Sequence, residues 1–164
     1  MATALLVVDM QVSLLTDETP NPDEIVGAVA DLVARARAAG APVVWITDSR
    51  VEPDAALIAG FVPAGDELQV VKSVRNGFEE TDLDAELTML AVDRVVICGM
   101  QSDACVTGTT TGASDLGYEV VLARDAHTTH ATDGRDWRAA IAAANEALAR
   151  LDRVEVLTAA EIVF

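Results

Sequence analysis

A strand-like run followed by a glycine and then a cysteine is the stretch of this sequence best suited to chemistry. The run 95–98 is apolar and rich in β-branched residues, Gly99 ends it, and Cys105 follows shortly afterwards. This order predicts a strand, a tight turn and a helix with Cys105 near its N-terminus. There the helix dipole and unpaired backbone N–H groups lower the pKa of a thiol and can hold an oxyanion. The alternative is a buried cysteine that packs as a small hydrophobe.

Charged residues end two other predicted strands. Asp9 follows the apolar run 4–8, and Lys72 follows the run 68–71. Because open parallel sheets build their sites at the carboxyl ends of strands, we expect both side chains to lie near Cys105.

Other roles are open for both Asp9 and Lys72. Asp9 could cap local amides, or serve phosphate transfer or magnesium binding, although Asp9-Met10-Gln11 lacks the second carboxylate such sites need. Lys72 could be a solvated lysine at a strand end.

The chain resembles the isochorismatase-like cysteine hydrolases, a superfamily that includes nicotinamidases, N-carbamoylsarcosine amidases and ureidoacrylate amidohydrolases. The family patterns concerned are Asp-x-Gln, then Lys…Phe…Thr-x-Leu, then Gly-x-x-[Ser/Thr]-x-x-Cys-Val, and a strand after them. The matching segments keep this order over nearly the whole chain: Asp9-Met10-Gln11, Lys72 with Asn76-Gly77-Phe78 and Thr81-x-Leu83, Gly99 through Val106, and Gly117-Tyr118-Glu119-Val120 with Asp125-Ala126.

The resemblance implies a catalytic triad of Asp9, Lys72 and Cys105. Asp9 would accept the thiol proton, the Lys72 ammonium would favour both ionised partners, and the Cys105 thiolate would attack an amide-type carbonyl to give a thioester. The backbone N–H groups of Gln101 and Cys105 would hold the oxyanion. The family pattern also implies a cis peptide bond between Met100 and Gln101.

The resemblance also implies a substrate pocket beside this triad. The residues expected to line it are Gln11, Leu14, Phe78 and Met100. His127 and His130 lie close together after Asp125. For these histidines we expect a structural or pocket-rim role rather than a dyad with Cys105 or a metal site, because metal sites seldom rest on so few donors.

The implied activity is hydrolysis of a small amide, carbamoyl or ureide C–N bond. Two alternatives stay open: a vinyl-ether hydrolase that uses Asp9 and Lys72 without covalent catalysis, and a binding or thiol-sensing protein that keeps the fold. The presence of Cys105 favours the amidase branch. Asp48 is followed by Ser49-Arg50-Val51, where nicotinamidases have metal-binding histidines. We therefore expect no metal and no cofactor, and nicotinamide is disfavoured as the substrate.

Strands and helices alternate along the chain, which predicts an α/β fold of three layers, with helices on both faces of a six-stranded, mainly parallel sheet. The loop 49–67 is rich in proline and glycine, and we expect a short helix in it around 54–59. The other expected elements are strands at 4–8, 43–47, 68–72, 95–98, 119–123 and 154–157, helices at 23–39, 83–90, 105–116 and 136–151, and a polar loop at 11–22.

Length and composition predict one domain over residues 1–164, and the resemblance implies that this domain is isochorismatase-like. A formal charge of -16 disfavours nucleic-acid and anionic-membrane binding, because such partners need a basic surface. The sequence has no run long enough to span a bilayer and no secretory leader pattern, so we expect a cytoplasmic protein. Cys98 and Cys105 are expected to be free thiols. The apolar fraction of 51% favours a homo-oligomer.

Overall fold

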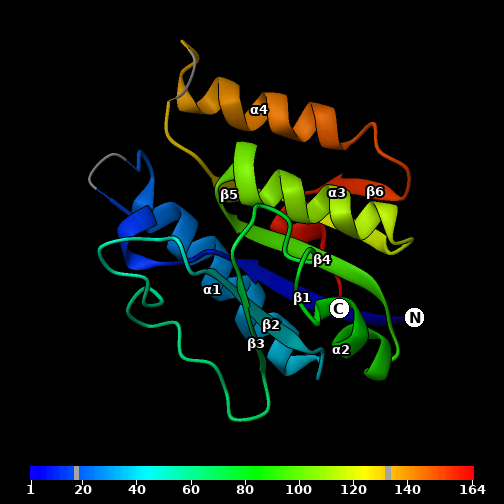
Figure 1. The fold of residues 1–164 in the computed structure, drawn as a ribbon. Coiled ribbons are helices and arrows are strands. Elements are labelled where there is room, and N and C mark those ends of the chain that lie inside the picture. Colours follow the sequence, from blue (N-terminus) through cyan, green and yellow to red (C-terminus); the bar gives the residue numbers. More distant parts are fainter. Residues whose placement is uncertain (17–18, 132–133) are drawn as a thin grey trace.

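The sheet of this computed structural model has six parallel strands in the order β3-β2-β1-β4-β5-β6 (Figure 1). The structure describes residues 1–16, 19–131 and 134–164. The central strands β1 and β4 are almost entirely buried, as expected for a parallel sheet covered on both faces. The strands are β1 (Ala2–Val8), β2 (Val43–Asp48), β3 (Leu68–Lys72), β4 (Val92–Met100), β5 (Glu119–Thr128) and β6 (Val154–Leu157).

Helices cover both faces of the sheet, so the predicted three-layer α/β fold is confirmed (Figure 1). Alternate residues of β1 show the division: Leu5 packs in the core under α1, and Leu6 packs in the core under α2 and α3. The helix α4 contacts α3 and adds Leu148 to the second core. The helices are α1 (Pro22–Ala38), α2 (Leu83–Met89), α3 (Thr107–Asp115) and α4 (Trp137–Leu148).

The loop 49–67 contains no helix at 54–59, so that expectation is wrong. The loop instead runs beside the segment after β1: Ile58 N–H donates to the Met10 carbonyl at 2.9 Å, and Val12 N–H donates to the Ala56 carbonyl at 2.9 Å. An extended segment that pairs with a neighbour satisfies its backbone polar groups without forming a helix. The segment 11–22 holds only the short 3-10 turn η1 (Val12–Leu14), and its residues 17 and 18 lie outside the described part of the chain.

The turn after β4 also differs from the expected α-helix. Residues Ser102–Val106 form a π-helical turn, η2, and α3 begins only at Thr107. Cys105 therefore lies inside an irregular turn, a type of turn that often occurs at functional sites.

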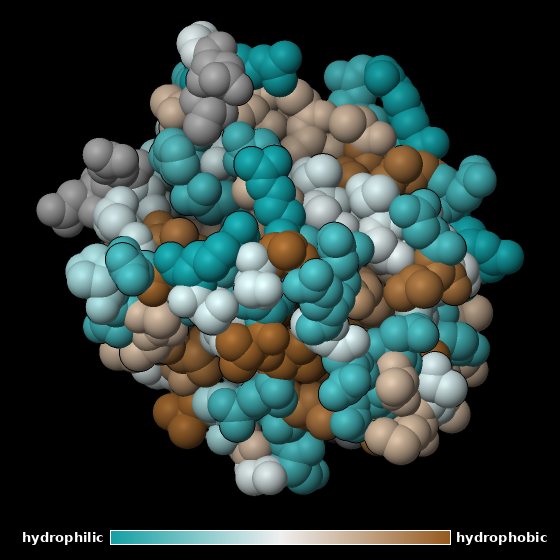
Figure 2. All heavy atoms as spheres, viewed as in Figure 1, coloured by the Kyte–Doolittle hydropathy of each residue, from teal (hydrophilic) through white to brown (hydrophobic). Residues whose placement is uncertain are grey.

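The surface carries apolar residues among many hydrophilic ones. Figure 2 shows hydrophobic residues in separate patches among hydrophilic ones on one face, and large exposed apolar side chains include Val62 and Val71. Among the described residues, no helix is both long and apolar enough to cross a membrane.

Candidate active site

Four side chains from four different elements meet at the carboxyl edge of the sheet. The Lys72 ammonium at the end of β3 donates hydrogen bonds to Asp9 Oδ2 at 2.8 Å, to Asp48 Oδ2 at 3.0 Å and to Cys105 Sγ at 3.1 Å. All four residues are buried. Because an ammonium has three N–H groups, each one has an acceptor here. The structure thus brings the three predicted catalytic residues together and adds a fourth, Asp48.

Backbone geometry at two positions allows this approach. Asp9 follows β1 with φ +48°, a left-handed conformation that aspartate adopts more readily than most residues and that is often found at functional sites. Gly99 pairs with Val8 in the neighbouring strand and has φ +117°. A Cβ at Gly99 would lie 2.0 Å from the Val8 carbonyl oxygen. Only glycine lets the end of β4 pack this closely against β1, and this contact sets η2 beside Asp9.

The turn η2 is fixed by its own backbone. The Gln101 carbonyl accepts hydrogen bonds from the N–H groups of Ala104 and Val106, both at 3.1 Å. The peptide bond between Met100 and Gln101 is cis, as expected. The turn places the Cys105 sulfur against Lys72 and leaves Cys105 8% exposed.

Asp48 was absent from the predicted catalytic residues. Its position at the end of β2 could have identified it as a site residue, because that strand is adjacent to β1 in the sheet. Arg50 holds its carboxylate through Nε at 2.9 Å and Nη2 at 2.6 Å. Burial opposes ionisation of Asp48, but these bonds from Arg50, together with those from Lys72, lower its pKa well below the usual range. Asp48 is therefore a permanent anion beside Lys72.

Gln11 holds the end of β2 rather than lining a pocket. Its amide accepts from the Asp48 N–H at 2.9 Å and donates to the Asp48 carbonyl at 3.1 Å and to the Ala55 carbonyl at 2.8 Å. The side chain is fully buried. The expectation that Gln11 lines the substrate pocket is replaced by a positioning role for Asp48 and the loop beyond it.

The other expected pocket residues lie mainly in the hydrophobic cores. Met100 is 1% exposed and packs under α1, so the structure does not place it on a pocket surface. Phe78 is 9% exposed and packs against the ring of Tyr118, with 5.7 Å between the centroids. Leu14 is half-buried against the core under α1. His130 Nδ1 lies 2.9 Å from Gln101 Nε2, which places this histidine near the turn that carries Cys105.

The Cys105 thiol is protonated at neutral pH. Burial and the nearby Asp9 carboxylate raise its pKa to about 11, and Lys72 only partly offsets this. The expected lowering of this pKa is therefore wrong, because desolvation of the thiolate outweighs the favourable charges. Burial opposes the charge of Lys72 as well, but attraction to Asp9 and Cys105 leaves the lysine pKa raised.

Asp9 is the better proton acceptor of the two carboxylates. Burial raises its pKa despite the attraction of Lys72, and its Oδ1 is buried without a hydrogen-bond partner among the described residues. The thiol also lies 3.9 Å from Asp48 Oδ2, but the strongly lowered pKa of Asp48 makes it a poor base. A carboxylate with a raised pKa and a free oxygen can take the thiol proton.

The same side chains define the only place in the described part of the chain where three ligating groups come together for a metal ion. Ligand atoms of Asp9, Asp48 and Cys105 lie within 4.8 Å of one another. The sequence has no histidines beside Asp48, but the fold brings Asp9 and Cys105 next to it. However, the Lys72 ammonium hydrogen-bonds to all three groups and supplies the positive charge that a metal would bring. The donor set does not fit a resident metal unless Lys72 is displaced.

Comparison with known proteins assigns the family. The family model of the Isochorismatase domain matches residues 3–159. A streptothricin hydrolase from Streptomyces noursei is 36% identical over 137 residues, which cover 77% of this chain and 54% of that protein. The chain spans about half the length of the two streptothricin hydrolases it matches.

Solved structures agree with this assignment. An isochorismatase from Pseudomonas putida superposes with a TM-score of 0.87 at 25% identity, covering 98% of this chain and 90% of that chain. N-carbamoylsarcosine amidase from Thermoplasma acidophilum superposes with a TM-score of 0.82 at 26% identity, covering 99% of both chains. The fold, the residue order and the matched profile lead to one conclusion: the chain belongs to the isochorismatase family.

Proposed function

We propose that this protein is a cysteine-dependent hydrolase of a small amide, carbamoyl or ureide C–N bond. The observation that carries the proposal is the Lys72 ammonium in contact with both Cys105 Sγ and Asp9 Oδ2 in a buried site. A thiol, a base with a free oxygen and a fixed cation are the parts that nucleophilic catalysis needs. The names of a streptothricin hydrolase and an N-carbamoylsarcosine amidase among the similar proteins support the same chemistry.

The first step of the proposed reaction is proton transfer from Cys105 to Asp9. With a thiol pKa of about 11, only about one molecule in ten thousand carries the thiolate at pH 7. The thiolate must therefore form as the substrate binds, by transfer of its proton to Asp9. Lys72 stays beside the sulfur and stabilises the new negative charge.

The second step is attack of the Cys105 thiolate on the substrate carbonyl carbon. The carbonyl π electrons move to oxygen, and we assign the backbone N–H groups of Gln101 and Cys105 to that oxyanion. When the tetrahedral intermediate collapses, the C–N bond breaks and the leaving nitrogen takes the proton held by Asp9. The products of this step are an amine or ammonia and a thioester on Cys105.

The third step is hydrolysis of the thioester. Asp9 accepts a proton from water, the hydroxide oxygen attacks the thioester carbonyl, and the C–S bond breaks. The proton returns to the sulfur, and the acid leaves as the second product. Asp48 lies 3.9 Å from the Cys105 sulfur but takes no proton in this scheme, and neither does Arg50. Asp48 instead keeps Lys72 charged and in place.

Intact-mass spectrometry with a panel of small amides, carbamoyl compounds and ureides tests the proposal. A mass increase equal to the acyl group, mapped to Cys105, is expected under acid quench. Cys105→Ala should abolish both the adduct and turnover. Cys98→Ala is the matched control, because Cys98 is a buried strand cysteine outside the site and should leave the adduct intact.

Other outcomes would overturn the covalent scheme. Turnover of a vinyl ether that survives Cys105→Ala would indicate the non-covalent hydrolase alternative. A protein inert to the whole panel whose Cys105 responds only to oxidants would indicate a thiol sensor.

A further inference from the structure

The turn η2 is held by side chains at the end of β5 and just beyond it. Three consecutive side chains at the start of the turn each contact a residue of the segment 127–130. The pairs are Ser102 Oγ with His127 Nδ1 at 2.7 Å, Thr129 Oγ1 with Asp103 Oδ1 at 2.8 Å, and Gln101 Nε2 with His130 Nδ1 at 2.9 Å. Of these three contacts, the one between Ser102 and His127 is the most deeply buried, with the two residues 0% and 2% exposed. Because water cannot replace a lost partner at such a place, this hydrogen bond matters most for the turn.

The sheet places His127 beside the start of the turn. β5 loses its register with β4 after Leu122 and pairs with it again at His127, which lies opposite Gly99. An irregularity of this kind changes the direction in which side chains point and is common next to active sites. His127 therefore reaches Ser102 where β4 ends and η2 begins.

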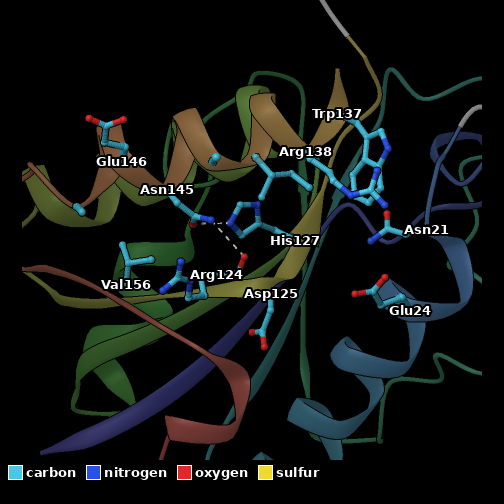
Figure 3. Close-up of a pocket in the computed structure, with 13 residues that line it drawn as sticks. Asn21, Glu24, Arg124, Asp125, His127, Trp137, Arg138, Asn145, Glu146 and Val156 are labelled. Atoms are coloured by element: carbon cyan, nitrogen blue, oxygen red, sulfur yellow. Dashed lines mark hydrogen bonds between the residues drawn. The ribbon is translucent and has the colours of Figure 1, made fainter. Parts of the chain in front are cut away.

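Asn145 on α4 determines which nitrogen of His127 accepts a hydrogen bond. His127 and Asn145 lie together in the wall of a cavity beside α4 (Figure 3). Asn145 Nδ2 donates to the Arg124 carbonyl at 3.3 Å, which leaves Asn145 Oδ1 facing His127 Nε2 at 2.9 Å. An amide oxygen only accepts, so His127 carries its proton on Nε2 and accepts the Ser102 hydroxyl at Nδ1. Burial lowers the pKa of His127, which favours this neutral form.

This chain of hydrogen bonds ends one residue from an amide that we have assigned to the oxyanion. Ser102 follows Gln101 directly, so a displacement of Ser102 would also turn the peptide group that carries the Gln101 N–H. Donors to a developing oxyanion are effective only when they are fixed in direction before the reaction.

From these observations we propose that His127 is a positioning residue for the oxyanion site. Through the Ser102 hydroxyl it holds the first residue of η2 and so fixes the direction of the Gln101 N–H. His127 itself transfers no proton in the reaction. The inference rests on the function proposed above, because an oxyanion develops only when Cys105 attacks a carbonyl.

Two reagents that modify the same sulfur test the proposal. With p-nitrophenyl acetate, the thiol proton passes to Asp9, the sulfur attacks the ester carbonyl, and the C–O bond breaks to release p-nitrophenolate. This acetylation develops an oxyanion. Iodoacetamide alkylates the sulfur by displacing iodide and develops none. Peptide mass spectrometry after acid quench gives both rates at Cys105.

Variants at both ends of the Ser102–His127 bond should slow the first reaction alone. Loss of an oxyanion donor costs about 100- to 1000-fold, and we expect a misdirected donor to cost about tenfold. Ser102→Ala and His127→Gln should therefore slow acetylation about tenfold and leave alkylation unchanged. His127→Asn places an amide oxygen near the Nδ1 position and should restore most of the acetylation rate. Ser114→Ala is the matched control, because its hydroxyl donates to the Asp152 carbonyl instead, and it should change neither rate.

Nitrogen-15 NMR of the imidazole rings tests the direction of the hydrogen bonds. The protein has two histidines, so His127→Asn identifies the His127 signals by their absence. In the wild-type protein His127 should be neutral, with a proton on Nε2 and none on Nδ1. A proton on Nδ1 would overturn the proposal, because Nδ1 could then not accept the Ser102 hydroxyl.

The rates separate a failure of this inference from a failure of the proposed function. Acetylation at the wild-type rate in Ser102→Ala and His127→Gln, or equal slowing of acetylation and alkylation, would overturn the positioning role of His127 alone. A wild-type Cys105 that is alkylated but never acetylated would overturn the proposed acyl transfer, and this inference with it.

Discussion

Replacing Lys72 with methionine isolates the energetic role of the buried cation. The Lys72 ammonium lies 2.8 Å from Asp9 Oδ2 and 3.0 Å from Asp48 Oδ2. At an effective dielectric constant of about 20, each attraction is worth about 6 kcal/mol before desolvation is counted. Desolvation of the ions offsets much of this, and breaking a buried ion pair by removing one partner costs about 3–5 kcal/mol. We therefore expect Lys72→Met to lower the free energy of unfolding at pH 7 by that amount.

The loss should depend on pH in a defined direction. Without Lys72, the buried Asp9 faces the Asp48 anion and loses the attraction that lowers its pKa. The folded-state pKa of Asp9 then lies further above its unfolded value. Stability linked to such a group is present at low pH and is lost as the pH rises through the folded pKa. The difference in the free energy of unfolding between Lys72→Met and the wild type should therefore shrink as the pH falls from about 7 to about 5, because Asp9 of the variant takes up a proton.

Urea unfolding followed by circular dichroism measures both effects. Arg153→Met is the matched control, since Arg153 pairs with Glu119 at the surface and such pairs contribute about 0–1 kcal/mol. A Lys72→Met loss as small as that of the control, or one that is the same at both pH values, would refute the view of Lys72 as a buried counter-ion to two carboxylates.

Other measurements test the site and the assembly. Cys105→Ala, Lys72→Ala and Asp9→Asn should each abolish most turnover, and pairs should cost little more than singles; multiplicative losses would show that they act independently. The rate of Cys105 alkylation should rise about tenfold per pH unit towards its pKa of about 11, and a plateau near neutral pH would contradict the buried, protonated thiol. Dialysis against a chelator should leave activity unchanged, because Lys72 holds the cation position; activity restored only by added zinc or iron would contradict this. Light scattering at micromolar concentration should report a homo-oligomer, since apolar side chains such as Val71 are exposed; a monomer would count against it.

The residues of the site that lie at strand ends could be predicted from the sequence. Asp9 and Lys72 each follow an apolar run, and parallel strands bring such ends to one edge, so their meeting with Cys105 follows from the pattern. Asp48 ends a strand in the same way, but its role depends on the bonds from Arg50 and Lys72, which only the packed structure shows. The parallel sheet and the helices on its two faces followed from the alternation of elements, whereas the strand order came only from the structure.

Depth of burial was the quantity that could not be predicted. A cysteine near a helix start predicts a lowered thiol pKa, yet desolvation at Cys105 reverses the sign. Gln11 fits a pocket wall by its motif, but both ends of its amide are bound to backbone groups. The stretch 54–59 has helix-forming alanines, but pairing with the segment after β1 keeps it extended. In each case a long-range contact outweighs the local preference.

The pairing between loop 49–67 and the segment 10–13 makes the two segments one structural unit for protein engineering. Backbone hydrogen bonds at Met10, Val12 and Ser13, and the Gln11 amide, attach the loop at several points. If the loop alone were transplanted from a relative, its hydrogen-bonding groups would not match those of the segment 10–13. Both segments should therefore be exchanged together, and libraries that vary one should vary the other, because contacting positions do not respond additively to mutation.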